Sequence, residues 1–278
     1  MSRIVFESDM WHDQHATYDL APALRLSALS VRSHAAHYQN ARSQDAIAVI
    51  GDGARRRLAF CVCDGVGSSF AGYIAARYLA RRLTSYLFTS AILEPPSPGL
   101  VETMLRQWVV AASTAVTEVA LPSEMNPLVR DVLDEMRAER GSETVFLAGL
   151  ARWDTSDAGD LRVYAMGNVS GVISSAHGGA VADSAINEQG SDSDRWTTRR
   201  GPVGALFAAR YPFTGRLRVA SDGLDALGSD AWLAPAERLM SRAAELRATT
   251  DTDDLAVLDI WPNLADNTMD NMLFAQET

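Results

Sequence analysis

The sequence contains few of the residues that form disulfides or structural zinc sites. Only two of its 278 residues are cysteine, Cys61 and Cys63, and only five are histidine. Two cysteines one residue apart are too close for an easy disulfide and too few for a zinc site. Alternate residues of a strand face the same side, so we expect two buried thiols on one strand face, in a reducing compartment.

Positive charge and long apolar runs are also scarce. Lys and Arg number 25 against 35 Asp and Glu, which gives a formal net charge of −10. Such a chain is not expected to bind nucleic acid, whose phosphates require a concentrated basic surface. No run of about 20 apolar residues predicts a membrane span, and the opening MSRIVFESDMWHDQ lacks the apolar stretch of a signal peptide. We therefore expect a cytoplasmic protein that does not contact membranes.

The order of the apolar patterns favours an α+β domain. We expect a leader, one domain and a weakly patterned tail, at residues 1–22, 23–262 and 263–278. Strand patterns at 24–33 and 46–63 precede a helical block within 71–137, and strand patterns return over 144–261. Residues 176–200 are polar and are expected to form a mobile loop. Strands, then helices, then strands fit a mixed α+β domain better than alternating βαβ units.

Four aspartates share one placement, at the start or the end of a predicted strand: Asp45, Asp64, Asp222 and Asp253. The strands of one sandwich can bring such ends together. Crowded carboxylates repel and resist ionisation, and divalent cations reverse that penalty; oxygen-only ligands favour hard ions such as Mg²⁺ or Mn²⁺. Two such ions can bind phosphate oxygens and lower the pKa of a shared water, which then attacks phosphorus. Taken singly, an aspartate at a strand end is usually a turn or cap residue, so the pattern needs support.

Six short segments form an ordered set along residues 24–261. They are Ser43–Ala46, Cys63–Ser68, Gly141–Thr144, Val163–Ser170, Ala220–Gly223 and Asp253–Asp254. Read in order, they resemble the PP2C (PPM) family of metal-dependent serine/threonine protein phosphatases, in a divergent bacterial branch. The second segment resembles the family's Asp-Gly-x-Gly signature and the fifth its Ser-Asp-Gly. The resemblance implies a central β-sandwich of two mainly antiparallel sheets flanked by helices.

The resemblance also implies a role for each matching residue. Asp64 would bridge two metal ions, and Gly65 would offer its backbone carbonyl to one of them. Asp222 and Asp253 would complete the shell of the other ion, and Asp45 would act near the ions, largely through bound water. The implied activity is removal of phosphate from phosphoserine and phosphothreonine of proteins by water activated by two Mn²⁺ or Mg²⁺ ions. We expect a monomer whose partner is a phosphorylated signalling protein.

Two positions depart from the family pattern. Asn168 stands where the family's Gly-Asp-Ser turn has an aspartate that is associated with a third, weaker metal site. Asp225 lies three residues after Asp222, whereas an acid four residues after is more usual. We therefore expect two ions and, at most, a poorly occupied third.

The residue that anchors the substrate phosphate is open among four that precede the first acidic segment: Arg32, His34, His37 and Arg42. Arginine is the best bidentate phosphate donor, so we favour Arg32, with His34 second. A histidine there could also protonate a leaving alkoxide. Each of the four has an ordinary explanation as a solvated loop residue.

Other activities are weighed against the phosphatase. A pseudophosphatase that binds phosphoproteins without turnover is motivated by Asn168, whereas the retained Asp64, Asp222 and Asp253 argue against it. A different two-metal hydrolase should carry histidine ligands, and no histidine-rich cluster accompanies Asp222 or Asp253. A thiol mechanism has no support, because neither cysteine lies in a Cys-x₅-Arg loop.

Overall fold

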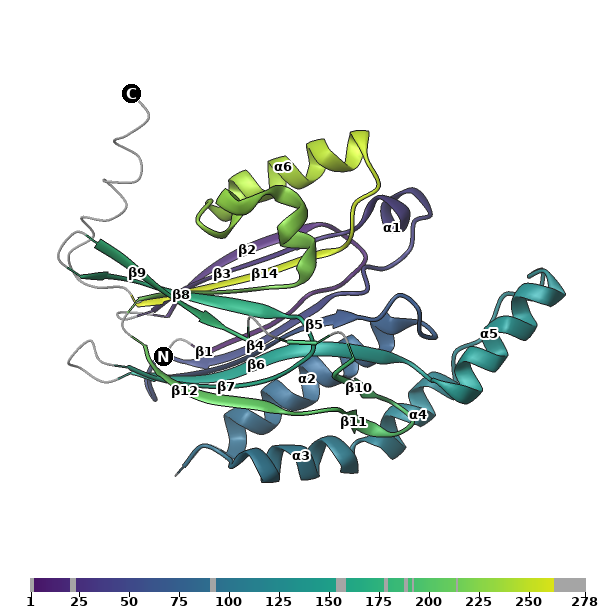
Figure 1. Ribbon diagram of the computed structural model, residues 1–278, viewed down its shortest axis with the longest axis horizontal. Helices are drawn as coiled ribbons and strands as arrows, with labels where there is room; N and C mark the ends of the chain where they lie inside the picture. The colour runs from purple at the N-terminus through teal and green to yellow at the C-terminus, as the bar shows by residue number, and fades with distance from the viewer. Residues whose placement is uncertain are drawn as a thin grey trace.

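A computed structural model describes residues 3–20, 24–90, 94–153, 159–177, 180–187, 190–191, 193–213 and 215–262. Within them, two sheets pack face to face and helices lie on the outer faces (Figure 1). All strand pairs are antiparallel. This arrangement confirms the predicted α+β sandwich. The predicted tail at 263–278 lies outside the described residues.

The first sheet has the order β1-β4-β5-β6-β10-β11, with β7 also paired to β6 and β12 paired to β7. Its strands are β1 Arg3–Glu7, β4 Ala46–Asp52, β5 Arg57–Gly65, β6 Glu143–Trp153, β7 Gly159–Met166, β10 Arg195–Thr197, β11 Gly201–Val203 and β12 Phe207–Pro212. The long strand β6 pairs with β10 through its first residues and with β7 along the rest.

The second sheet has the order β2-β3-β14-β13-β8-β9. Its strands are β2 Gln14–Leu20, β3 Leu24–Val31, β8 Ser170–His177, β9 Ala180–Ile186, β13 Arg216–Ala220 and β14 Leu255–Pro262. The central strands β14 and β13 come from the last part of the described chain, so this sheet joins segments that are far apart in the sequence.

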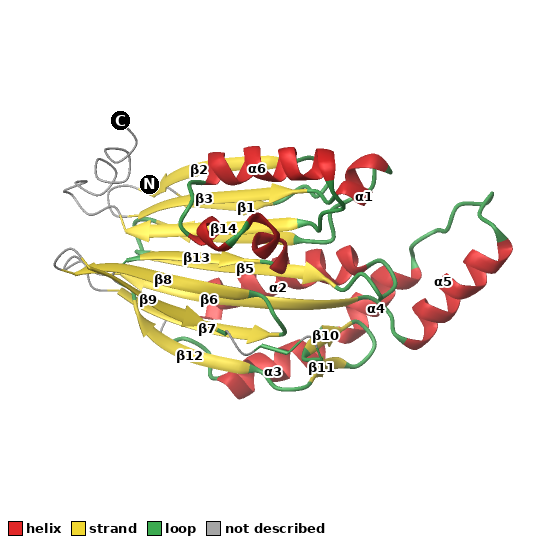
Figure 2. Ribbon diagram, turned by 45° about the horizontal axis from the view of Figure 1, so that its top comes forward, coloured by secondary structure: helices red, strands yellow, loops and turns green. Residues whose placement is uncertain are grey.

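Helices cover the sandwich on both sides, as Figures 1 and 2 show. The first sheet is covered by α2 Gly72–Ser90, α3 Pro98–Gln107 and α4 Val109–Thr117, and the second by η1 Asp222–Leu227, η2 Ser229–Trp232 and α6 Ala236–Thr249. The short α1 His34–Tyr38 lies at the end of the sandwich, and α5 Pro127–Glu139 projects beyond α4. Within the described residues, no helix combines the length and apolarity that crossing a bilayer requires.

The middle of strand β5, Leu58–Cys63, is apolar on both of its faces because both are covered. Successive side chains of a strand point to opposite faces. Phe60 and Val62 enter the core between the sheets, whereas Cys61 and Cys63 pack under α2. Both cysteines are free and buried, with their Sγ atoms 3.5 Å apart. The prediction of two buried thiols on one strand face is confirmed.

Two segments that the sequence did not present as strands belong to the sheets. The predicted leader supplies β1 and β2, the edge strands of the two sheets, so the boundary at residue 23 does not mark the start of the domain. An edge strand is half solvated, and its mixed polarity hides the period-2 signal. The polar stretch expected as a loop contains β9 and β10, because pairing with β8 and β6 supplies the backbone hydrogen bonds that define a strand.

Candidate metal centre

The four predicted aspartates lie where strands of the two sheets end together. Asp45 directly precedes β4 and Asp64 is near the end of β5, its neighbour in the first sheet. Asp222 begins η1 just after β13, and Asp253 precedes β14, the neighbour of β13 in the second sheet. Each sheet therefore contributes two carboxylates to one end of the sandwich.

Ser221 links the two halves of this site. Its hydroxyl donates a hydrogen bond to Asp45 Oδ2 at 2.6 Å, and its Oγ accepts one from the Ala256 backbone N–H at 2.9 Å. Asp45, from the first sheet, is thereby held against the second sheet. This contact fixes the distance between the sheets at the site, because both of its hydrogen bonds are buried.

The backbone around Asp64 is packed too closely for a side chain at the next position. A Cβ at Gly65 would lie 2.7 Å from both Gln44 O and Gly72 C, which is closer than real Cβ contacts. Thr144 Oγ1 also donates a hydrogen bond to the Asp64 carbonyl oxygen at 2.6 Å. The absence of a side chain at Gly65 therefore allows β5 and the start of α2 to approach each other beside the carboxylates.

The carboxylates raise one another's affinity for protons. Burial, followed by the charges of Asp64 and Asp254, raises the pKa of Asp45 well above its ordinary value. Burial and the charges of Asp222 and Asp253 do the same to the pKa of Asp64. Within the described residues, no ion pair joins Asp45 or Asp64 to an arginine. Among the described residues, Asp45 and Asp64 therefore gather acidic groups around them without an arginine counter-ion of their own.

The chemistry of this donor set fits a hard divalent cation. Carboxylate oxygens are the ligands that Mg²⁺ and Mn²⁺ prefer, and a bound cation removes the repulsion that raises the two pKa values. Within the described residues, however, no three Asp, Glu, His or Cys side chains are already arranged around one point. The residues thus fit the ions by type and place, and the side chains would have to turn inward to bind them.

Solved structures show which fold carries this centre. The serine-threonine phosphatase 2C from Toxoplasma gondii superimposes with a TM-score of 0.58 over 90% of this chain and 99% of its own, at 10% sequence identity. The S. agalactiae serine/threonine phosphatase gives 0.53 over 86% and 99%, at 14% identity. The chain has the PP2C-type phosphatase fold. The photosystem II phosphatase PBCP shares it too, with a TM-score of 0.50 over 86% and 98% of the two chains and 13% identity. No protein-family model matches the sequence, and neither does any curated protein.

In this PP2C-type fold, Asn168 and Asp225, the two positions that depart from the family pattern, contact different neighbours. Asn168 lies in the turn between β7 and β8, and its Nδ2 donates a hydrogen bond to Asp222 Oδ2 at 3.1 Å. Asp225 accepts a hydrogen bond of 3.4 Å from Trp232 Nε1. Asn168 therefore lies beside a predicted ligand as a neutral donor, while Asp225 is turned to a different partner.

Asp254 is the acidic residue whose role the sequence did not reveal. Its Oδ1 accepts a hydrogen bond from the Ser33 backbone N–H at 2.6 Å, and its Oδ2 accepts one from the Gln44 backbone N–H at 2.7 Å. The carboxylate thus ties down both ends of the segment that carries α1 and that leads directly into Asp45. The adjacent acids Asp253 and Asp254 can be seen in the sequence, but only the structure shows that Asp254 binds backbone N–H groups.

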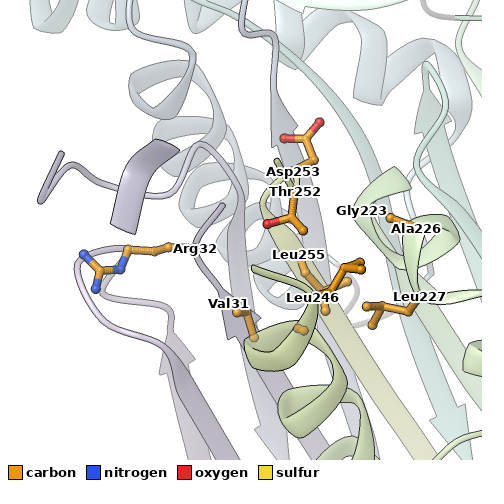
Figure 3. Close-up of a pocket in the computed structure, with 10 residues that line it drawn as sticks. Val31, Arg32, Gly223, Ala226, Leu227, Leu246, Thr252, Asp253 and Leu255 are labelled. Atoms are coloured by element: carbon orange, nitrogen blue, oxygen red, sulfur yellow. The ribbon is translucent and has the colours of Figure 1, made fainter. Parts of the chain in front are cut away.

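The candidate phosphate anchors lie around α1, and their side chains differ in availability. The Arg32 guanidinium lies 3.7 Å from Asp13 and within hydrogen-bond distance of Ala41 O and the His37 ring. Figure 3 shows that it points away from Asp253, although both residues line one small pocket. His34 Nδ1 lies 2.9 Å from Arg247 O. The structure does not bring the side chains of Arg32, His34 and His37 to the four predicted aspartates.

Arg42 has a different environment. Its guanidinium lies 4.6 Å from the ring centroid of Trp11 and 5.0 Å from that of Tyr73, so it is held between two aromatic faces. Within the described residues it has no carboxylate partner. Tyr73 lies in the first turn of α2, next to the glycine that packs against Gly65.

Proposed function

We propose that the chain is a metal-dependent phosphomonoesterase that removes phosphate from phosphoserine and phosphothreonine of proteins. One observation carries the proposal: aspartates from both sheets meet at one end of a PP2C-type sandwich, where burial and then the charges of the neighbouring acids raise the pKa of Asp45 and Asp64. Such a cluster costs stability unless cations bind to it, which is the condition of a binding site rather than of a structural ion pair.

Each residue of the centre would have a role that follows from its position. Asp64 would hold both Mn²⁺ or Mg²⁺ ions, because the charges of Asp222 and Asp253 act on it from the other sheet. These two aspartates and the carbonyl of Gly65 would complete the ligands. The bound cations would supply positive charge that activates a water and stabilises the phosphate oxygens. Asp45, fixed by Ser221, would orient that water.

Arg42 is the better anchor for the substrate phosphate. Arg32 was favoured from the sequence, but its guanidinium already has protein partners. Arg42 is a planar cation near two aromatic rings and has no carboxylate partner within the described residues, so its guanidinium would be available for a bidentate phosphate contact. If so, Arg42→Met should raise KM for a phosphopeptide by about tenfold or more, the loss of one charged contact. Arg32→Met should have the smaller effect on KM if Arg42 is the anchor, and the larger effect if the sequence-based choice is right.

The expected substrate is a phosphorylated signalling protein, and the enzyme would act as a cytoplasmic monomer. The net charge of −10 supports a protein substrate over a nucleic acid.

Removal of the bridging carboxylate tests the proposal. Hydrolysis of a chromogenic phosphate ester and of a phosphothreonine peptide should require Mn²⁺ or Mg²⁺ and stop in excess chelator. Asp64→Ala should lower the rate at least about 10²-fold, the scale of a lost electrostatic contribution, and should weaken Mn²⁺ binding in calorimetry. Asp19→Ala, an exposed acid distant in sequence from the centre, is the matched control and should keep full activity. Turnover by the Asp64→Ala protein at the native rate would refute the two-metal assignment.

A pseudophosphatase is the second candidate, and Asn168 is the observation that favours it. The amide lies at Asp222 where the family has an acid, which removes one negative charge from the centre. In that case the native protein would bind a phosphopeptide with Mn²⁺ present but would not release phosphate. The hydrolysis assay above, together with a calorimetric titration of the native chain with the phosphopeptide, therefore separates the two functions.

A further inference from the structure

Helix α5 is the part of the described structure that is least packed against the rest. Figures 1 and 2 show it extending away from the sandwich beyond α4. None of its residues, Pro127–Glu139, is fully buried, and none belongs to the three hydrophobic clusters. Isolated helices shorter than about 12–15 residues are marginal in water, and most helices in proteins are stabilised by packing of an apolar face.

Much of the apolar face of α5 lacks such packing, and Met136 is only partly covered. Leu128 is 75% exposed, Val129 50% and Val132 54%. Residues four apart lie on one side of a helix, so Leu128, Val132 and Met136 form one row, and Val129 extends it laterally. We call Leu128, Val129, Val132 and Met136 the apolar row. Among the described residues, α5 contributes three of the nine large hydrophobic side chains that are exposed, so the patch is contiguous rather than scattered.

A row of acids runs beside the apolar row. Asp131, Glu135 and Glu139 are also spaced by four, and all three are exposed. Like charges at this spacing destabilise a helix. Within the described residues, none of the three has a cationic partner. The acidic row therefore presents unbalanced negative charge along one border of the exposed apolar surface.

The other border is already used by the chain itself. Arg130 donates hydrogen bonds to Pro122 O and Ser123 O, and Arg137 donates one to Val119 O and lies 4.4 Å from the Phe70 ring centroid. These arginines are not free to pair with the acidic row of a second copy. Two copies would therefore place acidic rows near each other without counter-charges, which disfavours self-association through α5.

We propose that α5 is a docking site for a helix of a partner protein whose apolar stripe is bordered by lysine or arginine. The apolar row would receive the stripe, and Asp131, Glu135 and Glu139 would pair with the basic border. Charge complementarity of this kind selects partners and speeds association, while the buried apolar contacts supply the affinity. The site is distinct from the carboxylate centre, and the proposal holds whether or not the centre catalyses phosphate release.

A synthetic peptide of known chemistry tests the surface directly. The probe is a labelled, roughly 18-residue amphipathic helix of leucine and lysine, and the control peptide has the same composition in an order that gives no apolar face. Fluorescence anisotropy with the full chain should show saturable binding of the probe and at least about tenfold weaker binding of the control peptide, a difference of 1.4 kcal/mol. Equal binding of the two peptides would show that the interaction is only non-specific attraction between opposite charges, and this would overturn the proposal.

Matched variants on the same helix localise the binding. Leu128→Ser with Val132→Ser should weaken the probe at least about tenfold, and so should Asp131→Lys with Glu135→Lys, because interface core residues carry most of the energy. Asp134→Lys reverses one charge outside the acidic row, at a residue that lies 3.9 Å from Arg137, and Ala138→Ser changes an exposed position that belongs to neither row; both should bind within about twofold of the native chain. Exposed substitutions of this kind change stability little, and circular dichroism checks the fold.

Two further outcomes would replace the proposed partner. A dimer in sedimentation that Leu128→Ser abolishes would assign the apolar row to a second copy. Flotation with phosphatidylglycerol vesicles that the same variant abolishes would assign it to a membrane surface. Loss of probe binding in the Asp134→Lys and Ala138→Ser controls to the same extent as in the row variants would equally refute the site.

Discussion

Asp45 and Asp259 are equally buried, with 2% and 1% of their surfaces exposed, yet their carboxyl groups have opposite environments. Asp259 lies on the outer face of β14, where Arg216 and Arg218 both pair with it. Their charges and hydrogen bonds overcome the effect of burial and lower the pKa of Asp259. Asp45 faces Asp64 and Asp254 instead, and its pKa is raised.

The contrast separates a structural ion cluster from a functional one. Arg218 also donates hydrogen bonds to Ala231 O and Ala234 O, so the paired cluster fastens the η2 region to the second sheet. Within the described residues, Asp45 and Asp64 form no ion pair with an arginine that would join two elements in this way. Burial of Asp45 and Asp64 beside other acids is a cost to stability, and it is the observation on which the proposed cation site rests.

The largest effect is expected when the structural cluster is broken. Arg218→Ala leaves Asp259 with Arg216, whose side chain is 27% exposed, as its partner and removes the hydrogen bonds to the η2 region. Loss of one member of a buried pair costs about 3–5 kcal/mol, so we expect the free energy of unfolding in urea to fall by that amount. Arg216→Ala removes the more exposed arginine and should cost clearly less. Equal losses of unfolding free energy in the two variants would contradict the expectation that the more buried arginine contributes more to stability.

The pH dependence of stability should differ in sign between the two clusters. A raised pKa means that the folded state holds the proton more tightly, so the contribution of Asp45 and Asp64 is full below the ordinary value of 3.8 and is lost as pH rises through the raised pKa. The contribution of Asp259 is present above 3.8 and is lost as pH falls through its lowered pKa.

Addition of a divalent metal ion should remove the pH dependence of stability that comes from Asp45 and Asp64. In chelator, Asp64→Asn should flatten the loss of stability as pH rises toward 8. Free Mn²⁺ at a hundred times its Kd should stabilise the native chain by about 2.7 kcal/mol at pH 8 and should do little for the variant. Thermal unfolding with and without Mn²⁺ measures both effects, and the same stabilisation in the variant would show that the ion binds elsewhere.

A smaller effect is expected at Asp254, which positions other residues. Asp254→Ala releases the Ser33 and Gln44 backbone N–H groups together and should lower kcat about tenfold or more, with KM for the phosphopeptide changed as α1 loosens. Asp254→Asn keeps one acceptor oxygen and should recover part of the loss. If Asp254 were instead a metal ligand, both variants would lose Mn²⁺ affinity as strongly as Asp64→Ala does.

The smallest effect concerns Asn168. Asn168→Asp replaces a neutral amide beside Asp222 with a carboxylate, which should tighten Mn²⁺ binding several-fold because hard cations prefer charged oxygens. Calorimetric titration would detect the change. An unchanged affinity would indicate that residue 168 lies outside the coordination shell and that the loss of an acid there does not limit the site.

Much of the centre was readable from the sequence. Strand alternation predicted β5 and its two buried thiols, and the ordered segments predicted a sandwich in which the four aspartates meet. The edge strands β1 and β2 were not readable, because half-solvated strands carry mixed polarity. The choice between Arg32 and Arg42 as the proposed phosphate anchor was not readable either, since the two residues are alike in sequence and differ only in what surrounds them.

The sequence by itself determined the periodic parts of the protein: the apolar strands, the helical block and the acidic strand ends, because period and residue type are local properties. The tertiary structure alone decided which acid does what. Asp253 and Asp254 are neighbours in the chain, but only the folded molecule gives both oxygens of Asp254 to backbone N–H groups more than 200 residues away. Charge balance is likewise a property of the fold, since Asp45 and Asp259 acquire opposite pKa shifts from partners that their own segments do not contain.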